Sequence, residues 1–243
     1  MRHRSLHGAR DNHGKIVPLG TGVEPVAWKK QRDELLSTVL EMDRLGLVSG
    51  TSGNASVRLE KAADPNAFLI TPAALPYPTM TPGQLVPVNG AMEPLEGDGV
   101  PSSESLLHLA IYRARADVRA VMHTHSVYAS ALAVAGRPLP PIVDELVVYV
   151  GGQVEVAEYG FPGTEALARA GVEALGDRRA VLLRHHGMFA VADTAKEALR
   201  VCALVERVAH IFICAEAIGG AREVPAASFE AERRMYLERA GLT

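Results

Sequence analysis

Three histidines and one glutamate are the side chains of this sequence best suited to chemistry. His123 and His125 lie in VMHTHSV, His186 lies in LLRHHGM and Glu104 lies in PSSES, each beside apolar strand-like sequence or a helix start. Three neutral imidazoles and one carboxylate suit Zn²⁺, because these motifs hold no thiolate and offer no all-oxygen site for Mg²⁺ or Ca²⁺. The sequence therefore predicts one divalent metal site for Zn²⁺, with Mn²⁺, Co²⁺ or Fe²⁺ as alternatives.

The spacing of His123 and His125 favours two ligands to the same ion. Residues two apart on a strand point to the same face, and the apolar run from Val118 to Met122 predicts a strand here. The spacing leaves open an alternative, in which the two histidines form hydrogen bonds and bind no metal.

The sequence VLLRHHGMFAV, residues 181–191, predicts a second strand that carries histidines. Adjacent strand residues face opposite ways, so only one of His185 and His186 should reach the metal. Gly187 suits a bulge or a close backbone approach beside a ligand.

Two groups of small polar residues could bind an anion. Thr51 and Asn54 lie in GTSGN, whose short donors and exposed amides suit a phosphate, although such a cluster between a helix and a strand can be only a turn. Ser102 and Ser103 precede Glu104, where the same sequence also resembles the capped start of a helix.

Composition indicates one soluble globular domain over residues 27–243. The chain has 243 residues, 48% of them hydrophobic, and a net charge of −3. Residues 1–26 are polar, rich in glycine and without a secretory signal, and we interpret them as a mobile tail. The absence of a long apolar run and of a basic stripe argues against membrane and nucleic-acid partners. Cys202 and Cys214, both in a predicted buried helix, indicate no disulfide framework and a reducing, cytoplasmic location.

Periodicity and capping residues predict the elements that position these side chains. Helices and strands in this arrangement indicate α/β layers with a mainly antiparallel or mixed sheet. A turn is expected at Asn89-Gly90. Helices are predicted over residues 28–45, over 104–115 with Ser102 as the cap, from Ser126 onward, and over 164–175, 194–219 and 229–239. Strands are predicted directly after GTSGN, at AFLIT, and over 118–122 and 181–191. Residues 146–150 are predicted to form a strand or another buried segment.

Several of these motifs occur in the order typical of one protein family. EMDRLGLVSGTSGNASVR, LITPAALPY, PSSE, VMHTHSVYASA, Gly151-Gly152 and LLRHHGMFA follow one another between Lys29 and the C-terminal helix. In this order the chain resembles the class II aldolase/adducin family, most closely the members that cleave fuculose 1-phosphate. The resemblance implies a three-layer α/β/α sandwich around a largely antiparallel central sheet, and a homotetramer with active sites at subunit interfaces.

The resemblance also implies an activity and a role for each motif. The implied reaction is reversible cleavage of a ketose 1-phosphate to dihydroxyacetone phosphate and an aldehyde through a metal-stabilised enediolate. Other members imply alternatives: a decarboxylase, epimerase or dehydratase of sugar phosphates on the same metal site, or a non-catalytic, adducin-like interaction module. The implied roles are zinc ligands for His123, His125 and His186, fourth ligand and general base for Glu104, and phosphate binding for Thr51, Asn54, Ser102 and Ser103.

The chain departs from the family pattern at positions that contact substrate. Ala73-Ala74 replaces a Thr-Gly pair that helps to hold phosphate, which removes one hydroxyl donor. Glu145 stands where a tyrosine protonates the aldehyde side, and Ala240 where an interface tyrosine is found. Tyr149 or Tyr236 is a candidate replacement.

Four further residues have interpretations that the pattern leaves open. Asp144 and Glu145 could act as an acid/base pair or bind a polar aldehyde portion, or they could be a solvated loop. His108 follows Glu104 by four residues on one helix face, and we interpret it as structural. His210 is expected to be a packed, hydrogen-bonded helix residue.

Overall fold

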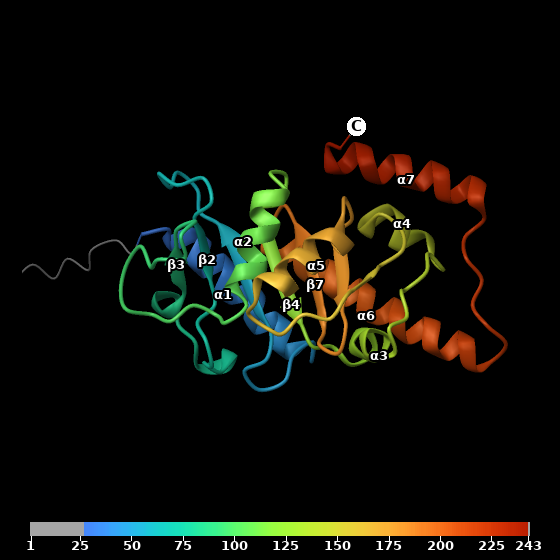
Figure 1. The fold of residues 1–243 in the computed structure, drawn as a ribbon, viewed down its shortest axis with the longest axis horizontal. Coiled ribbons are helices and arrows are strands. Elements are labelled where there is room, and N and C mark those ends of the chain that lie inside the picture. The colour runs from blue at the N-terminus through green and yellow to red at the C-terminus, as the bar shows by residue number, and fades with distance from the viewer. Residues whose placement is uncertain (1–26, 243) are drawn as a thin grey trace, which may run out of the picture.

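A seven-stranded sheet crosses the protein and carries helices on both faces (Figure 1). The computed structural model describes residues 27–242, so the tail expected over residues 1–26 lies outside the described part of the chain. The strand order is β3-β2-β1-β4-β7-β6-β5. The strands are β1 Asn54–Arg58, β2 Phe68–Ile70, β3 Val86–Val88, β4 Ala120–Thr124, β5 Val156–Ala157, β6 Ala180–Leu183 and β7 Met188–Ala192.

The pairing of these strands is antiparallel except between β5 and β6, which run parallel. This arrangement confirms the predicted α/β fold with a largely antiparallel central sheet. The helices are α1 Lys29–Arg44, α2 Ser105–Ala114, α3 Val127–Ala135, α4 Asp144–Val150, α5 Glu165–Leu175, α6 Ala195–Ala217 and α7 Ala226–Ala240, and two 3-10 turns, η1 Tyr77–Thr79 and η2 Pro82–Gln84, lie before β3.

Alternation along the strands divides the core into two parts. On β4, Ala120 and Met122 pack with α1, α3, α4 and α6, while Val121 on the opposite face packs with α2 and α5. On β7, Phe189 and Val191 belong to the α2 and α5 side. Two helical layers therefore cover the sheet, as the three-layer sandwich requires. His123 shares the face of Val121, which directs it towards α2.

The predicted strand over residues 146–150 is wrong, because these residues form helix α4. Leu146, Val147 and Val150 are fully buried, and this spacing puts them on one face of a helix. Asp144 in the first turn favours a helix start, and Gly151 ends the helix with a φ of 98°. The alternative of a buried segment is the correct one.

The histidine-bearing segment 181–191 is a hairpin and not one strand. Strands β6 and β7 pair antiparallel around a short turn at residues 184–187, in which the His186 amide donates to the Leu183 carbonyl at 3.0 Å. His185 has a φ of 57°, the left-handed conformation that a tight turn requires and a strand excludes. The apolar pattern did not reveal the turn because the turn contains only three polar residues.

Three smaller expectations also need correction. Helix α2 begins at Ser105 with Glu104 as its N-cap, so Ser102 is not the cap, although its hydroxyl accepts from the Glu104 amide at 3.4 Å. Cys214 is exposed and only Cys202 is buried. Strand β5 was not predicted, because two residues are too short to give a pattern. By contrast, Thr164 and Thr194 cap α5 and α6 as expected.

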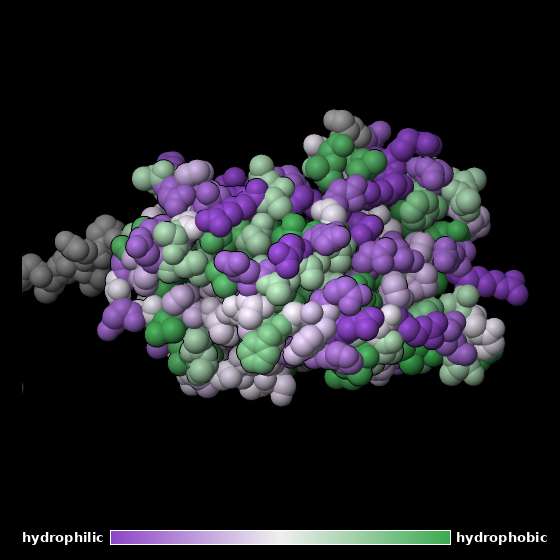
Figure 2. All heavy atoms as spheres, in the orientation of Figure 1, coloured by the Kyte–Doolittle hydropathy of each residue, from purple (hydrophilic) through white to green (hydrophobic). Residues whose placement is uncertain are grey.

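Helix α7 lies apart from the sheet and packs on α4 (Figure 1). Tyr236 is its one buried residue, and the tyrosine hydroxyl donates to the Asp177 carbonyl at 2.6 Å. A Cβ on Gly151 would lie 2.9 Å or less from Arg233 and Tyr236 side-chain atoms, so the glycine permits this close contact. Figure 2 shows hydrophilic residues spread over the viewed face, with smaller hydrophobic areas between them. None of the helices in residues 27–242 has the length and apolarity needed to cross a membrane.

Gly187 should be essential to the join between β4 and the hairpin. A Cβ at this position would lie 2.3 Å from the Thr124 carbonyl oxygen, a backbone atom that cannot move aside. We expect Gly187→Ala to lower the free energy of unfolding of chelator-treated protein by about 1–3 kcal/mol or more, measured by denaturant titration. Gly83→Ala is the control, because no atom lies within 4 Å of its added Cβ. Equal stability of the two variants would contradict the close approach.

Candidate metal centre and active site

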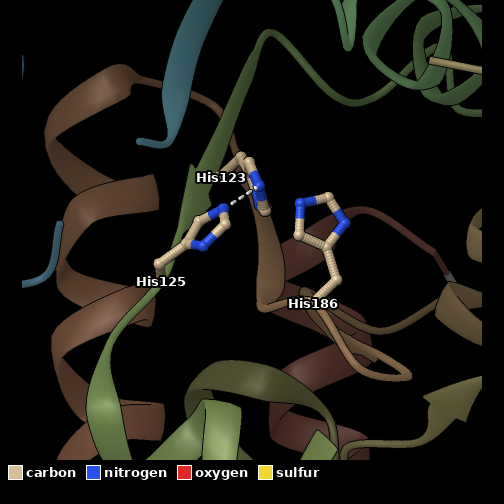
Figure 3. A group of neighbouring side chains, drawn as sticks. All are labelled: His123, His125 and His186. Carbon is tan, nitrogen blue, oxygen red and sulfur yellow. Dashed lines mark hydrogen bonds between the residues drawn. The ribbon is translucent and has the colours of Figure 1, made fainter. Parts of the chain in front are cut away.

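The three histidines singled out in the sequence meet at one end of the sheet (Figure 3). One ligand nitrogen from each of His123, His125 and His186 lies within 4.8 Å of the other two. The Nε2 atoms of His123 and His125 are 2.9 Å apart. His185 is exposed and outside this group, near the ring of Tyr159.

Each histidine is positioned by a different local feature. His123 is the fourth residue of β4, stacks on Phe189 and donates from Nδ1 to the Met188 carbonyl at 2.9 Å. His125 follows the end of β4, where its amide donates to the Leu47 carbonyl at 3.0 Å. His186 lies in the β6–β7 turn.

The Glu104 carboxylate, which is 6% exposed, joins these histidines from the start of α2. Glu104 Oε2 lies 2.9 Å from His123 Nε2, and Oε1 lies 3.1 Å from His186 Nε2. Asn54 Nδ2 donates to Oε2 at 2.9 Å. The antiparallel register that sets Asn54 opposite His123 brings this amide to the same point.

Burial and charge shape the ionisation of the group. Burial alone would raise the pKa of Glu104, but the charge of His123, hydrogen bonds from His123 and Asn54, and the charge of His186 hold it well below its usual range. Burial lowers the pKa of His125 to about 4, with His123 and His186 adding to the effect. Burial also lowers the pKa of His186. Unprotonated imidazoles beside a carboxylate anion are the forms that bind metal.

The donor arrangement fits a divalent cation. His123 Nδ1 carries the proton given to Met188, so Nε2 faces the Glu104 oxygen 2.9 Å away either with a second proton, as in the charged form that lowers the Glu104 pKa, or with a lone pair. Two acceptors at that distance need a cation or an extra proton between them. Nitrogens bound tetrahedrally at about 2.0–2.1 Å from one zinc ion lie roughly 3.4 Å apart, close to the spacing of the His123 and His125 nitrogens.

A cavity of about 350 Å³ opens beside this centre. Its lining brings together the metal-site residues and the predicted anion-binding residues. The lining also includes Ala73 and Ala74, the latter with a φ of 55°, a left-handed conformation unusual for a residue other than glycine. The cavity residues are Thr51, Ser52, Gly53, Asn54, Pro72, Ala73, Ala74, Ser102, Ser103, Glu104, His125, Pro162 and His186.

The loop before β1 is fixed against the metal-site strand. Tyr77 donates from its hydroxyl to the Ser52 carbonyl at 3.1 Å, and the Ser49 amide donates to the Ser52 hydroxyl at 3.0 Å. A Cβ on Gly53 would lie 2.7 Å from the His123 carbonyl oxygen. Thr51 at the tip of this loop is exposed, as is Ser103 across the cavity, so both hydroxyls are accessible to a ligand.

The four residues considered for the aldehyde side lie elsewhere in the single chain. Glu145 pairs with Arg207 at 2.5 Å, and Tyr149 lies under the guanidinium of Arg239 at 4.6 Å. Asp144 lies at the start of α4, and the Tyr236 hydroxyl is committed to a backbone carbonyl. None of the four lines the cavity described above.

His108 is a residue whose place in the site the sequence did not reveal. Its ring is fully buried behind Asn54, with Nε2 2.6 Å from Asn54 Oδ1. The spacing of four residues from Glu104 was the available signal, but it placed His108 only on the same helix face. The contact with Asn54 depends on the packing of α2 over β1. His210 stacks on Tyr128 but is exposed, so the expectation of a packed, hydrogen-bonded residue is wrong.

Comparisons with known proteins find one family. The family model described as the class II aldolase and adducin N-terminal domain matches residues 33–213. The L-fuculose phosphate aldolase of Escherichia coli O6:H1 is 37% identical over 185 residues, covering 76% of this chain and 83% of the relative. The 5-deoxy-D-ribulose 1-phosphate aldolase of Bacillus thuringiensis serovar kurstaki is 38% identical over 197 residues, covering 81% and 91%.

A solved structure shows the same fold. The chain superposes on an L-fuculose 1-phosphate aldolase with a TM-score of 0.80 and 31% sequence identity. The match covers 85% of this chain and 96% of the other. The sheet, its two helical layers and the arrangement of the elements around the histidines are therefore shared with a protein of that name.

We expect the two neighbouring histidines of the hairpin turn to differ in metal binding. His186→Ala should lower the affinity for Zn²⁺ by more than about 100-fold, beyond the usual cost of losing an outer-shell partner, because one ligand is lost. His185→Ala should keep the metal, since its ring is exposed outside the cluster. Titration of chelator-treated protein with elemental analysis measures both. Full metal occupancy in His186→Ala would remove this residue from the ligand set.

Acid should destabilise the metal-free protein. His125 and His186 have pKa values lowered on folding, so below about pH 6.5 the unfolded chain binds more protons than the folded one. For His125, stability present above pH 6.5 is then lost towards pH 4, by less than about 1.4 kcal/mol per pH unit because solvent screens this partly exposed ring. His186 changes the stability in the same direction. Denaturant titrations over this range should show a smaller slope for His125→Gln. An unchanged slope would contradict the lowered pKa, and His185→Gln is the control.

Proposed function

The chain belongs to the class II aldolase and adducin family, and from this membership we propose that it is a metal-dependent aldolase cleaving a ketose 1-phosphate to dihydroxyacetone phosphate and an aldehyde. Relatives named as aldolases support an enzyme, and one superposes with a TM-score of 0.80. The proposed substrate is fuculose 1-phosphate or a similar ketose 1-phosphate, since relatives are named for both L-fuculose phosphate and 5-deoxy-D-ribulose 1-phosphate.

One observation carries the proposal: a buried carboxylate stands between histidines at the wall of a cavity lined with hydroxyls. Glu104 contacts His123 and His186, while Ser102 and Thr51 line the same cavity. An interaction module has no need of this group, because burying a charge costs desolvation energy even when the charge is paired. The geometry thus favours catalysis over the adducin-like alternative.

We propose that His123, His125, His186 and Glu104 hold the metal, and that the metal is zinc. The ligand set of three imidazoles and one carboxylate without thiolates suits zinc, with Mn²⁺, Co²⁺ or Fe²⁺ as alternatives. Bound there, the ion would act as a Lewis acid, polarising oxygens of the substrate and stabilising negative charge during cleavage. Glu104 is also the proposed general base.

In this proposal Glu104 carries out the proton transfer at carbon. Its carboxylate is held as an anion at the cavity wall, where it can accept the α-proton of dihydroxyacetone phosphate in the condensation direction and return that proton to carbon in cleavage. Cleavage breaks a carbon–carbon bond, releases the aldehyde and leaves the enediolate of dihydroxyacetone phosphate. Protonation of that enediolate at carbon completes the reaction, and the hydroxyl proton released with the aldehyde passes to the separate group proposed for the aldehyde side.

Phosphate binding is proposed for the cavity rim. Thr51 and Ser103 are exposed residues of the cavity lining, and Ser102, which is buried, lines the same cavity. Asn54 can donate only with the amide hydrogen left after its bond to Glu104. These phosphate-binding residues would orient the substrate, and correct orientation of the reacting groups accounts for a large part of an enzyme's rate acceleration. Ala73 adds no donor, in keeping with the departure seen in the sequence.

The assembly and location remain part of the proposal. A homotetramer with active sites at subunit interfaces would let Asp144, Glu145 or Tyr149 reach the site of a neighbouring subunit, because all three lie on α4, with Tyr149 half exposed. Tyr236 is buried, which weighs against that role. We propose a cytoplasmic enzyme acting on a small phosphorylated sugar, without nucleic-acid or membrane partners.

A coupled assay for dihydroxyacetone phosphate tests the function. Zinc-loaded and chelator-treated protein would be given fuculose 1-phosphate, 5-deoxyribulose 1-phosphate and related ketose 1-phosphates. Release that requires metal supports the aldolase and ranks the aldehyde portions. No release from any of them by zinc-loaded protein would contradict it and favour a decarboxylase, epimerase or dehydratase on the same site.

Glu104→Gln should abolish turnover while largely keeping the fold. The amide preserves the shape of the side chain but cannot accept the substrate proton, so kcat should fall by at least about 10²–10⁴-fold. The rate would be measured at saturating Zn²⁺, with metal content confirmed, and circular dichroism would report the fold. Glu165→Gln on the exposed start of α5 is the control. Preserved turnover in metal-loaded Glu104→Gln would exclude the residue as the base.

A further inference from the structure

A chain of buried hydrogen bonds runs from helix α2 to the Glu104 carboxylate. Tyr112 Oη lies 2.8 Å from Ser56 Oγ, which lies 2.6 Å from His108 Nδ1. His108 Nε2 lies 2.6 Å from Asn54 Oδ1, and Asn54 Nδ2 lies 2.9 Å from Glu104 Oε2. All five side chains are at least nine-tenths buried, so no solvent competes for these bonds.

The chemistry of its two ends fixes the direction of this chain. An ionised Glu104 can only accept, so Asn54 must present its NH₂ group to the carboxylate and its oxygen to His108. That oxygen can only accept, so His108 carries its proton on Nε2 and accepts on Nδ1 from the Ser56 hydroxyl. Ser56 in turn accepts from Tyr112. One orientation of the Asn54 amide therefore satisfies both the Glu104 carboxylate in front of it and the three hydrogen bonds behind it.

The neighbours of His108 allow no other partner for its ring. The edge of the ring meets Phe189 at a centroid distance of 5.3 Å, an apolar contact. Burial lowers the pKa of His108 to about 3, with the charge of His123 adding to the effect, so the ring is neutral at physiological pH. A neutral imidazole with both nitrogens occupied acts as a rigid spacer between Ser56 and Asn54.

We propose that His108 is a positioning residue that, with Ser56 behind it, fixes the Asn54 amide so that Glu104 is held in the orientation needed to exchange protons with substrate. The proposal rests on the proposed function of Glu104. In this proposal the main role of Asn54 is to hold the Glu104 carboxylate, so Asn54 has only one amide hydrogen left for the substrate phosphate. His108 itself touches neither substrate nor metal.

The test compares two replacements of His108 in the full-length, zinc-loaded protein. His108→Leu removes both hydrogen bonds, and we expect kcat for fuculose 1-phosphate to fall by about 10–100-fold, as for outer-shell partners elsewhere, with full metal content and KM within about threefold. His108→Gln keeps one donor and one acceptor and should recover most of the lost kcat. Ile111→Val, a buried apolar change on the same helix, is the control and should leave kcat unchanged.

The comparison of the two variants separates positioning from general loosening of the structure. Loss of the Asn54 hydrogen bond leaves the Glu104 carboxylate free to turn, so kcat should fall without a matching change in KM in His108→Leu and should recover in His108→Gln. Wild-type kcat in metal-loaded His108→Leu would overturn the proposal. So would an equal loss of kcat in the leucine and glutamine variants. If His108→Leu does not fold, Ser56→Ala replaces it, and an unchanged kcat in metal-loaded Ser56→Ala overturns the proposal.

A readout independent of turnover tests the hydrogen-bond chain itself. Nitrogen-15 spectra of histidine-labelled, zinc-loaded protein should contain a ring that stays neutral and protonated at Nε2 throughout pH 6 to 8 and is missing from His108→Gln. If His108 shows the opposite tautomer, or if its ring titrates in this pH range, the proposal for His108 is overturned while the proposed aldolase function stands. Lack of aldolase turnover in the wild type despite the expected tautomer would instead overturn the proposed function, and with it the catalytic role of His108.

Discussion

The burial of one carboxylate is the constraint on which the site depends. Glu104 sits at the start of α2 with little access to water, where an unpaired charge would cost several kcal/mol. Two imidazoles and an amide surround it, and they arrive from β4, the β6–β7 turn and β1. The three elements come together only because β1, β4 and β7 are neighbours in the sheet. The site can therefore form only if the strands pair in this order.

The two sides of the sheet share this work unequally. The α1, α3, α4 and α6 side is a continuous apolar core, whereas the α2 and α5 side has a polar column running through it. His123, Ser56 and Asn54 all come from strand positions that face α2, and alternation along β1 and β4 puts them there. The apolar side supplies stability, which lets the other side accommodate buried polar groups that contribute to function.

Local patterns in the sequence gave much of this structure, and non-local contacts account for the rest. The helices capped by Thr164 and Thr194 and the histidine pair before Ser126 could be predicted because spacing and capping act within a few residues. The helix over residues 144–150 and the turn at His185 were mistaken for strands, because short apolar runs fit either structure. The contact of His108 with Asn54 spans 54 residues, so no local pattern encodes it.

The ends of the sheet also affect how copies of the protein can meet. An open edge strand exposes unpaired backbone groups that can bind another chain and start aggregation. Here β5 is only two residues long, and β3 has Pro87 at its centre, whose carbonyl accepts from the Leu95 amide at 2.8 Å. Neither edge offers a long row of free donors and acceptors. Association through strand addition is therefore disfavoured, and any self-assembly is left to side chains on helices and loops.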